Sequence, residues 1–298
     1  MNWRPVARKE FRDLVRSKGA WLMGLLITAG AIYLMGDEPP FVQNQLGTNV
    51  VLAAFQRPVG VIVPLTAILI AYRSIAGERV SGSIKFAVGF PQTRSDILIG
   101  KILGQSVALG VPLIAAFLVA GATGIVRIGL FSLIGFASFL GLSLLYTLVN
   151  VSIATGISAA VSRPTRAAAG TFGYFLVFLL SWYRIRNWMY SLVTGETLNI
   201  FTPPASEWLF LFERLSPITA FYLITNRVLG VGNGASGYFN VLGQFQASIT
   251  TNALVYDLVF TDPAPFYLTE EFGLVILGLW IIIPSALGFH VFRTADLS

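Results

Sequence analysis

Long apolar runs constrain the fold of this chain more than any other feature of its sequence. About 20 consecutive apolar residues cross the hydrocarbon core of a bilayer as a helix. Backbone polar groups in that core must be paired within their own segment, so helices are the expected form. We therefore predict an all-α polytopic membrane protein with a single transmembrane domain (1–298). Its six predicted spans cover about 20–36, 50–72, 102–122, 129–161, 167–183 and 272–292.

The composition agrees with this architecture and excludes several other classes of protein. Only 11% of the residues are charged and 55% are hydrophobic, whereas soluble domains carry roughly 25% charged residues. The chain has no cysteine, one histidine and four methionines, so a disulfide framework and a thiolate metal site are excluded and few soft metal ligands remain. We predict no bound metal, and we interpret the net charge of +6 through its distribution between loops and not as a nucleic-acid-binding surface.

The N-terminal segment, residues 2–18, has the pattern of a basic amphipathic helix. Arginines recur at every fourth residue and so share one face, and an apolar stripe that includes Phe11 lies beside them. Such a helix typically lies in the membrane interface. A signal peptide is the alternative, but the charged part is long and patterned, and several further spans follow. The predicted basic face comprises Arg4, Arg8, Arg12 and Arg16.

The most informative polar interval is 74–101, between the second and third predicted spans. Its mixed charges cannot remain in hydrocarbon and must lie in water or against another protein. Residues 83–89 are enough for about two helical turns, and Pro91 ends that helix because proline disfavours a helical conformation in the preceding residue. Thr93 and Asp96 match a capping box that begins the next helix. We interpret the interval as a short surface helix between two spans, with an ordinary solvated loop as the alternative.

The same interval carries a resemblance to a known family. The sequence has GER at 77–79, GS at 82–83, FPQTR at 90–94 and GK at 100–101. This order resembles the cytoplasmic loop of ABC transporter permeases of the type-2 exporter family, and the Arg-x-x-Asp-Leu tail at 293–297 is also similar. The resemblance implies that the short helix is a coupling helix that docks on a separate ATPase subunit. It assigns docking to Glu78, Gly82, Ser83, Ile84, Lys85, Phe86 and Arg94.

The distribution of positive charge predicts the orientation in the membrane. Lysine and arginine are concentrated in 2–18, in 74–101 and in the loop at 162–166, whereas the intervals on the opposite side carry fewer of them. By the positive-inside rule, both termini and the coupling segment lie in the cytoplasm. We expect a multi-pass protein of the plasma membrane. The long interval 184–271 then lies outside, where it can bind an extracytoplasmic partner or gate the exit. Within it, Ser216 and Pro217 predict the start of a helix that ends near Gly230.

Three polar residues within the predicted spans are further candidates. Arg57 lies in the second span, where an ionisable residue indicates a functional role, although snorkelling toward the outer headgroups is an alternative. Asn150 and Thr155 belong to a polar stripe at helical spacing in the fourth span. That stripe fits a substrate path or a dimer seam, and hydrogen bonds that join neighbouring helices are the alternative.

The resemblance implies transport that is driven by ATP hydrolysis in another subunit. The Gly-Lys pair at 100–101 is not a phosphate loop, because Ser95 replaces the required glycine and Ile102 replaces the hydroxyl residue. We therefore expect no catalytic residue and no cofactor in this chain, with ATP and Mg²⁺ held by two copies of an ABC ATPase. Six spans are half of such a transporter, so a second permease copy or a paralogue is implied, alongside membrane lipid.

Three alternative functions remain at this stage. A gradient-driven secondary transporter usually has inverted repeats and carboxylates within its spans, which this sequence does not show. An intramembrane enzyme needs converging catalytic groups at depth, and the sequence offers no such set. The third alternative is a permease that acts with an extracytoplasmic partner in metalloenzyme maturation.

Overall fold

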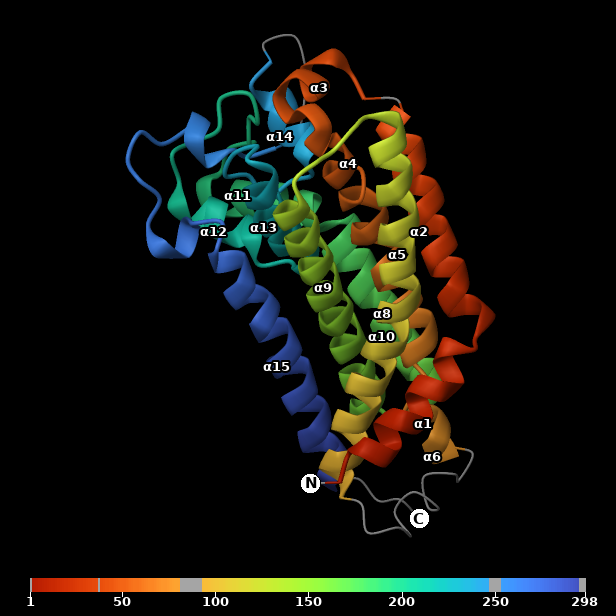
Figure 1. The fold of residues 1–298 in the computed structure, drawn as a ribbon. Coiled ribbons are helices and arrows are strands. Elements are labelled where there is room, and N and C mark those ends of the chain that lie inside the picture. The colour runs from red at the N-terminus through yellow and green to blue at the C-terminus, as the bar shows by residue number, and fades with distance from the viewer. Residues whose placement is uncertain (1, 37, 81–92, 247–252, 295–298) are drawn as a thin grey trace.

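The computed structural model describes residues 2–36, 38–80, 93–246 and 253–294 (Figure 1). Over these ranges every regular element is a helix, apart from one isolated antiparallel bridge between Gly234 and Val255. Among the described residues, five helices are long and apolar enough to cross a membrane, and a sixth crossing results if one sharply bent pair is counted as a span. The predicted all-α polytopic architecture is therefore confirmed, with five or six crossings.

The second predicted span is divided by a turn. Because Pro58 has no N–H to donate to the carbonyl of Ala54, the helical hydrogen-bond pattern is interrupted there, and residues 54–55 form a turn. The apolar stretch also begins ten residues earlier than predicted, at Pro40. The elements of this first part are α1 (Arg4–Val15), α2 (Lys18–Gly36), α3 (Pro40–Leu46), a 3₁₀ turn (Gly47–Asn49), α4 (Val50–Ala53), α5 (Gln56–Ala71) and α6 (Ala76–Val80).

The third and fourth spans are long, uninterrupted helices. Helix α8 (Arg94–Arg127) has 34 residues, and the predicted capping box at its start is confirmed, since Thr93 and Asp96 cap each other's backbone N–H groups. At about 1.5 Å per residue this helix is near 50 Å long, well beyond the roughly 30 Å hydrocarbon core. Part of α8 must therefore project from the bilayer. Helix α9 (Leu133–Ala160) follows after a short connection.

The fifth span differs from its prediction. Helix α10 (Pro164–Tyr174) passes through a π-helical turn (Phe175–Leu180), and α11 (Trp182–Thr194) then leaves at an angle of 70°. The predicted end of the span at residue 183 therefore falls in a second helix that continues into the interval 184–271.

The interval 184–271 folds into short helices at the end of the bundle that also carries α3 (Figure 1). Helix α13 (Pro217–Leu229) confirms its prediction, with Ser216 at the N-cap and Gly230 in the left-handed conformation, φ 67°, at the C-cap. The remaining elements are α12 (Glu207–Arg214), α14 (Tyr238–Gln244), 3₁₀ turns at Tyr256–Leu258 and Phe266–Leu268, and the last span α15 (Phe272–Thr294). At the opposite end of the bundle lie α1 and α6.

Glycines allow α9 and α15 to cross in close contact. A Cβ atom added at Gly288 of α15 would lie 2.4 Å from the carbonyl oxygen of Gly156 in α9, and one added at Gly156 would lie 2.4 Å from the carbonyl oxygen of Pro284. Small residues allow such backbone contact between membrane helices, where van der Waals packing replaces the hydrophobic effect. The two helices are therefore in direct backbone contact near the end that carries α1.

Candidate functional site

Helix α1 packs on the projecting part of α8 through two glycines one turn apart. A Cβ atom added at Gly100 would lie 2.6 Å from the Cβ of Val6, and one added at Gly104 would lie 2.5 Å from the carbonyl oxygen of Ala7. The side of α1 that carries Ala7 therefore packs against α8, and the interfacial position of residues 2–18 stays a prediction. Phe11 is half-buried, and the four arginines of the predicted basic face are all exposed.

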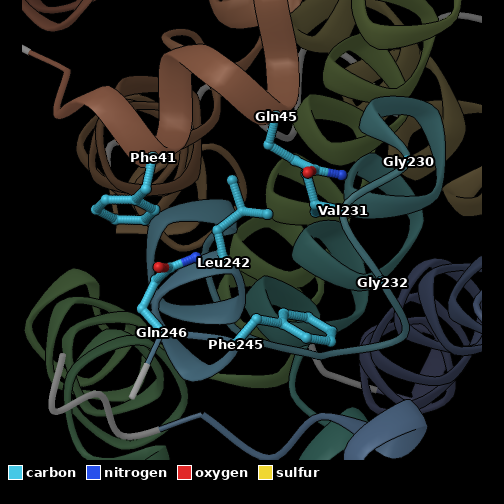
Figure 2. Close-up of a pocket in the computed structure, with 8 residues that line it drawn as sticks. All are labelled: Phe41, Gln45, Gly230, Val231, Gly232, Leu242, Phe245 and Gln246. Atoms are coloured by element: carbon cyan, nitrogen blue, oxygen red, sulfur yellow. The ribbon is translucent and has the colours of Figure 1, made fainter. Parts of the chain in front are cut away.

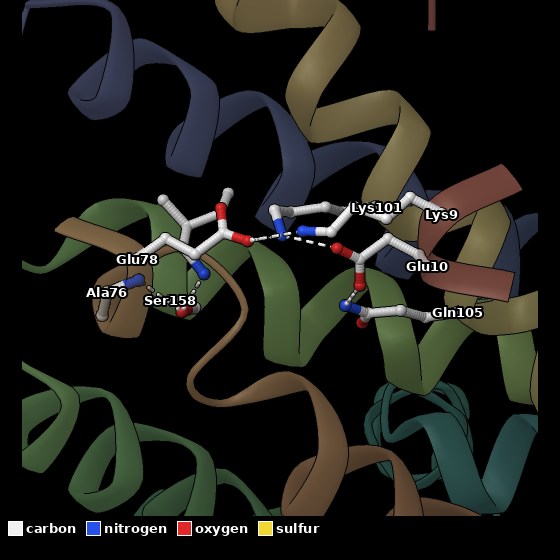
Figure 3. Close-up of polar contacts among 8 residues, drawn as sticks. Lys9, Glu10, Ala76, Glu78, Lys101, Gln105 and Ser158 are labelled. Carbon is white, nitrogen blue, oxygen red and sulfur yellow. Dashed lines mark hydrogen bonds and ion pairs between the residues drawn. The ribbon is translucent and has the colours of Figure 1, made fainter. Parts of the chain in front are cut away.

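A buried lysine joins α1, α6 and α8. The ammonium group of Lys101, whose side chain is only 3% exposed, lies 2.7 Å from a carboxylate oxygen of Glu10 and 2.8 Å from one of Glu78 (Figure 3). The amide of Gln105 donates to the second oxygen of Glu10 at 2.9 Å. Lys9 lies 3.8 Å from Glu78 but remains largely exposed. Lys101 is thus shared by two acidic residues from two helices that are far apart in the sequence.

The electrostatics of this cluster favour the ionised form of Glu10. Burial alone would raise the pKa of this carboxyl group. The attraction of Lys101 and the hydrogen bonds from Gln105 and Lys101 together outweigh burial, so the pKa of Glu10 lies below its ordinary value of 4.5. A buried charge of this kind is stable only because its partners are in place.

Helix α6 is also fixed to the last turn of α9. The hydroxyl group of Ser158 accepts hydrogen bonds from the backbone N–H groups of Ile75 and Ala76, both at 3.1 Å, and donates to the carbonyl of Tyr72 at 2.8 Å. The guanidinium group of Arg79 donates to the carbonyl of Ala159 at 2.9 Å. Cations at a helix C-terminus satisfy its unpaired carbonyls and interact favourably with its dipole.

Arg94, which follows residues 81–92 in the sequence, binds the end of α15. Its guanidinium group donates to the carbonyls of Phe292 at 2.6 Å and Arg293 at 2.9 Å, at the C-terminal end of α15. The ring of Phe292 is buried, and its centroid lies 5.7 Å from the guanidinium carbon of Arg94 and 4.9 Å from that of Arg79. The two arginines that flank 81–92 therefore converge on one aromatic ring.

We call this set of contacts the loop frame. Among the predicted docking residues, it contains Glu78 and Arg94, whereas Gly82, Ser83, Ile84, Lys85 and Phe86 lie outside the described residues. Sequence reasoning missed the pairing of Glu10 with Lys101, and the only available signal was the glycine spacing at 100 and 104. The loop frame consists of Glu10, Glu78, Arg79, Arg94, Lys101, Ser158 and Phe292.

A second polar network lies where the second span is broken. The side chain of Gln56 is buried, donates to Thr225 and Asn226 at 2.8 Å each, and accepts from the backbone N–H of Tyr238 at 2.7 Å. The phenol group of Tyr238 in turn donates to Glu38. Gln56, at the start of α5, thus joins the second span to α13 and α14. Arg57, which the sequence singled out, is exposed, and its guanidinium carbon lies 5.7 Å from the ring centroid of Phe239.

The side chains of Asn150 and Thr155 are buried in the helix bundle. Asn150 donates to the carbonyl of Tyr146 at 2.8 Å and accepts from the phenol group of Tyr174 at 3.0 Å, so it joins α9 to α10. Thr155 is also fully buried, and its hydroxyl group has no hydrogen-bond partner among the described residues. The roles of these residues and of Arg57 in a path or a dimer seam stay predictions.

A pocket of about 330 Å³ opens at the end of the bundle opposite the loop frame (Figure 2). Helix α3, the loop that follows α13, and α14 surround it. Its walls combine two aromatic rings, aliphatic groups, two amide side chains and glycine backbone. The lining residues are Phe41, Gln45, Gly230, Val231, Gly232, Leu242, Phe245 and Gln246. Within the described part of the chain there is no group of three or more His, Cys, Asp and Glu residues that could hold a metal ion.

Comparison with known proteins assigns the family. The sequence model for the family described as ABC-2 family transporter protein matches residues 4–297, which is almost the entire chain. The chain belongs to the ABC-2 transporter family. The resemblance that the polar interval carries is thereby confirmed, and the loop frame surrounds the interval on which that resemblance rests.

Two curated proteins are similar to the chain over more than half of its length. A protein of Stutzerimonas stutzeri named probable ABC transporter permease protein NosY is 27% identical over 229 residues, which cover 74% of this chain and 79% of the relative. A protein of the same name from Pseudomonas aeruginosa is 27% identical over 190 residues, 59% of this chain and 66% of the relative. The chain is thus a multi-pass ABC-2 permease, a class whose members in general work with an ABC ATPase and as dimers.

Proposed function

We propose that this chain is the permease subunit of an ATP-driven exporter, and that residues 81–92 dock a separate ATPase subunit. The observation that carries the proposal is the loop frame. Helices α1, α9 and α15 converge on α6 and α8, the two helices that flank 81–92, through charge-assisted contacts, which are roughly twice as strong as neutral hydrogen bonds. An ordinary solvated loop does not need this degree of fixation at both ends.

The loop frame supplies a mechanical route from the docked segment to the spans. A displacement of 81–92 pulls Glu78, whose carboxylate is bound to Lys101 of α8. On the far flank it pulls Arg94, which is the first residue of α8 and holds the end of α15. Because α8 is one continuous helix of 34 residues, it carries that movement along its whole length. Closure of two ATPase subunits on ATP then rocks the spans of two permease chains relative to one another.

Orientation and partners follow from the same proposal. The positive-inside distribution puts both termini and the loop frame in the cytoplasm of a plasma-membrane protein. ATP and Mg²⁺ are held by two ATPase copies, and the second permease is a further copy or a paralogue. The helices of the interval 184–271 and the pocket beside α3 then face outward, where the aromatic and amide groups of the pocket fit a protein partner better than an ionic cargo.

A coupling experiment tests this function. The permease is reconstituted with its ATPase subunit, and complex formation and ATP turnover are compared for Arg94→Gln and for the control Arg163→Gln, an exposed arginine at the start of α10. We expect Arg94→Gln to lower the permease-dependent ATP turnover about tenfold, the equivalent of one charge-assisted hydrogen bond, while the control keeps it. ATP turnover that does not respond to the permease, or to Arg94→Gln, would contradict the proposal.

A further inference from the structure

The basic face of α1 points away from the bundle. Packing on α8 at Gly100 and Gly104, together with the bond from Lys101 to Glu10, fixes the rotation of this helix. A shallow hollow of about 510 Å³ on the exposed side is lined by Arg4, Pro5, Arg8, Lys9, Arg12 and Asp13. In the described part of the chain, no ion pair within 4.0 Å involves any of the four arginines. Their charge is therefore available to a ligand.

The start of α2 fixes the level of this face relative to the bilayer. Helix α2 has 19 residues, which at about 1.5 Å per residue match one hydrocarbon core of roughly 30 Å. Trp21, in its first turn, is 47% exposed, and its indole N–H donates to the carbonyl of Val15 at 2.8 Å. Exposed tryptophans at span ends typically lie at the headgroup level. The contact with Val15 therefore places the end of α1 that carries Arg12 and Arg16 at the same level.

We propose that the basic face of α1 binds the phosphate headgroups of anionic phospholipids. The charges of Arg12 and Arg16 lie at the level of the headgroups, and those of Arg4 and Arg8 continue the face along the same helix. Each arginine near an anionic surface favours association by about fivefold, which is about 1 kcal/mol. A zwitterionic headgroup offers no net charge and lacks this preference. The inference needs no ATPase subunit, so it stands or falls independently of the proposed function.

Quenching of Trp21 by brominated lipids measures the preference directly. The full-length permease is placed in lipid nanodiscs of phosphatidylcholine that contain a minority of brominated phosphatidylglycerol or of brominated phosphatidylcholine. The chain has six tryptophans. The part of the quenching that disappears in the Trp21→Phe variant is therefore the signal of Trp21. We expect brominated phosphatidylglycerol to quench Trp21 several-fold more effectively, and we expect the difference to shrink at high salt because ions screen charges near a surface.

Charge variants decide whether the basic face is responsible. Arg12→Gln with Arg16→Gln should bring the two brominated lipids to equal quenching, whereas Arg12→Lys with Arg16→Lys should keep the preference. Arg163→Gln with Arg166→Gln removes two exposed charges from another helix and should have no effect. Added inorganic phosphate should not compete. Equal quenching by both lipids in the unmodified protein would overturn the proposal. So would the absence of quenching by either lipid, which would place this face against water or another protein.

Discussion

At the scale of single residues, Lys101 is the most consequential side chain of the loop frame. It is buried, and its ammonium group is shared by carboxylates from two helices. Removing this shared counter-ion leaves Glu10 with the hydrogen bond from Gln105, and it leaves Glu78 with the more distant Lys9. The loss of folding free energy comes mainly from the carboxylates that no longer have their shared counter-ion, and less from the strength of the original ion pairs.

We predict that Lys101→Met destabilises the protein by about 3 kcal/mol, the lower end for a broken buried pair because both carboxylates keep some contact with solvent. The apparent melting temperature in detergent should fall by about 5 °C or more. Adding Glu10→Gln to Lys101→Met should recover part of the loss, because one unpaired charge is then removed. A melting temperature that Lys101→Met leaves unchanged would show that the ion pairs contribute nothing.

The pKa of Glu10 predicts a specific sensitivity to acid. Since the pKa of this group in the folded protein lies below its ordinary value of 4.5, its stabilisation is complete above about pH 4.5 and is lost as the pH falls through the lowered value. Melting temperatures measured between neutral and acidic pH should therefore drop more for the unmodified protein than for Glu10→Gln. Parallel curves for the two proteins would show that Glu10 is not an ionised partner of Lys101.

Gln56 is buried and its neighbour Arg57 is exposed, so substitutions at these two positions can be compared directly. Replacing Gln56 by Leu removes three hydrogen bonds and leaves Thr225, Asn226 and the N–H of Tyr238 with unsatisfied capacity, a loss of about 2 kcal/mol or more. Arg57→Gln changes an exposed side chain and should alter stability by less than about 0.5 kcal/mol. Thermal unfolding of the two variants distinguishes these effects. If Arg57→Gln were the more damaging change, the network at Gln56 would not be the link between the broken span and the outer helices.

At the scale of elements, the crossing of α1 and α8 depends on the absence of side chains at two positions. A Cβ at Gly104 would lie 2.5 Å from a backbone oxygen and 2.8 Å from the Cβ of Glu10, and a backbone cannot yield as a flexible side chain can. Any larger residue must therefore push α1 off α8. That movement also draws Glu10 away from Lys101.

We predict that Gly104→Ala destabilises the protein by roughly 1–3 kcal/mol, as is typical of overpacking. Gly141→Ala is the matched control in α9, because a Cβ there meets nothing within 4 Å, and alanine is a better helix former than glycine. Protease sensitivity of the N-terminal segment should increase in Gly104→Ala alone. Equal stability of the two variants would show that α1 does not depend on this close approach.

Several elements could be predicted from the sequence because their signals are local. Proline and serine at the start of α13 with glycine at its end, and Thr93 with Asp96 before α8, are each determined within a few residues. The 70° corner after α10 could not be predicted. Hydropathy measures only whether a segment is apolar, and it does not report a change in its direction.

At the scale of the whole molecule, polar chemistry is concentrated at the two ends of the bundle. The loop frame joins α1, α6, α8, α9 and α15 at one end, and the network around Gln56 joins the broken span to α13 and α14 at the other. The sequence indicated the first site through Glu78, Arg94 and the Gly-Lys pair at 100–101. It did not reveal Glu10 or Phe292, because partners separated by more than 90 residues leave no local pattern.

Crosslinking from residues 81–92 identifies what this segment contacts. The chain has no cysteine, so Phe86→Cys introduces a single thiol for a photoreactive crosslinker, and Val126→Cys, 87% exposed near the other end of α8, is the control. The adducts formed in native membranes are identified by mass spectrometry. We predict that Phe86→Cys captures a protein with the phosphate-loop pattern G-x-x-x-x-G-K-[ST] and that Val126→Cys does not. An intact complex in which Phe86→Cys captures no ATPase, or in which Val126→Cys captures it instead, would contradict the account.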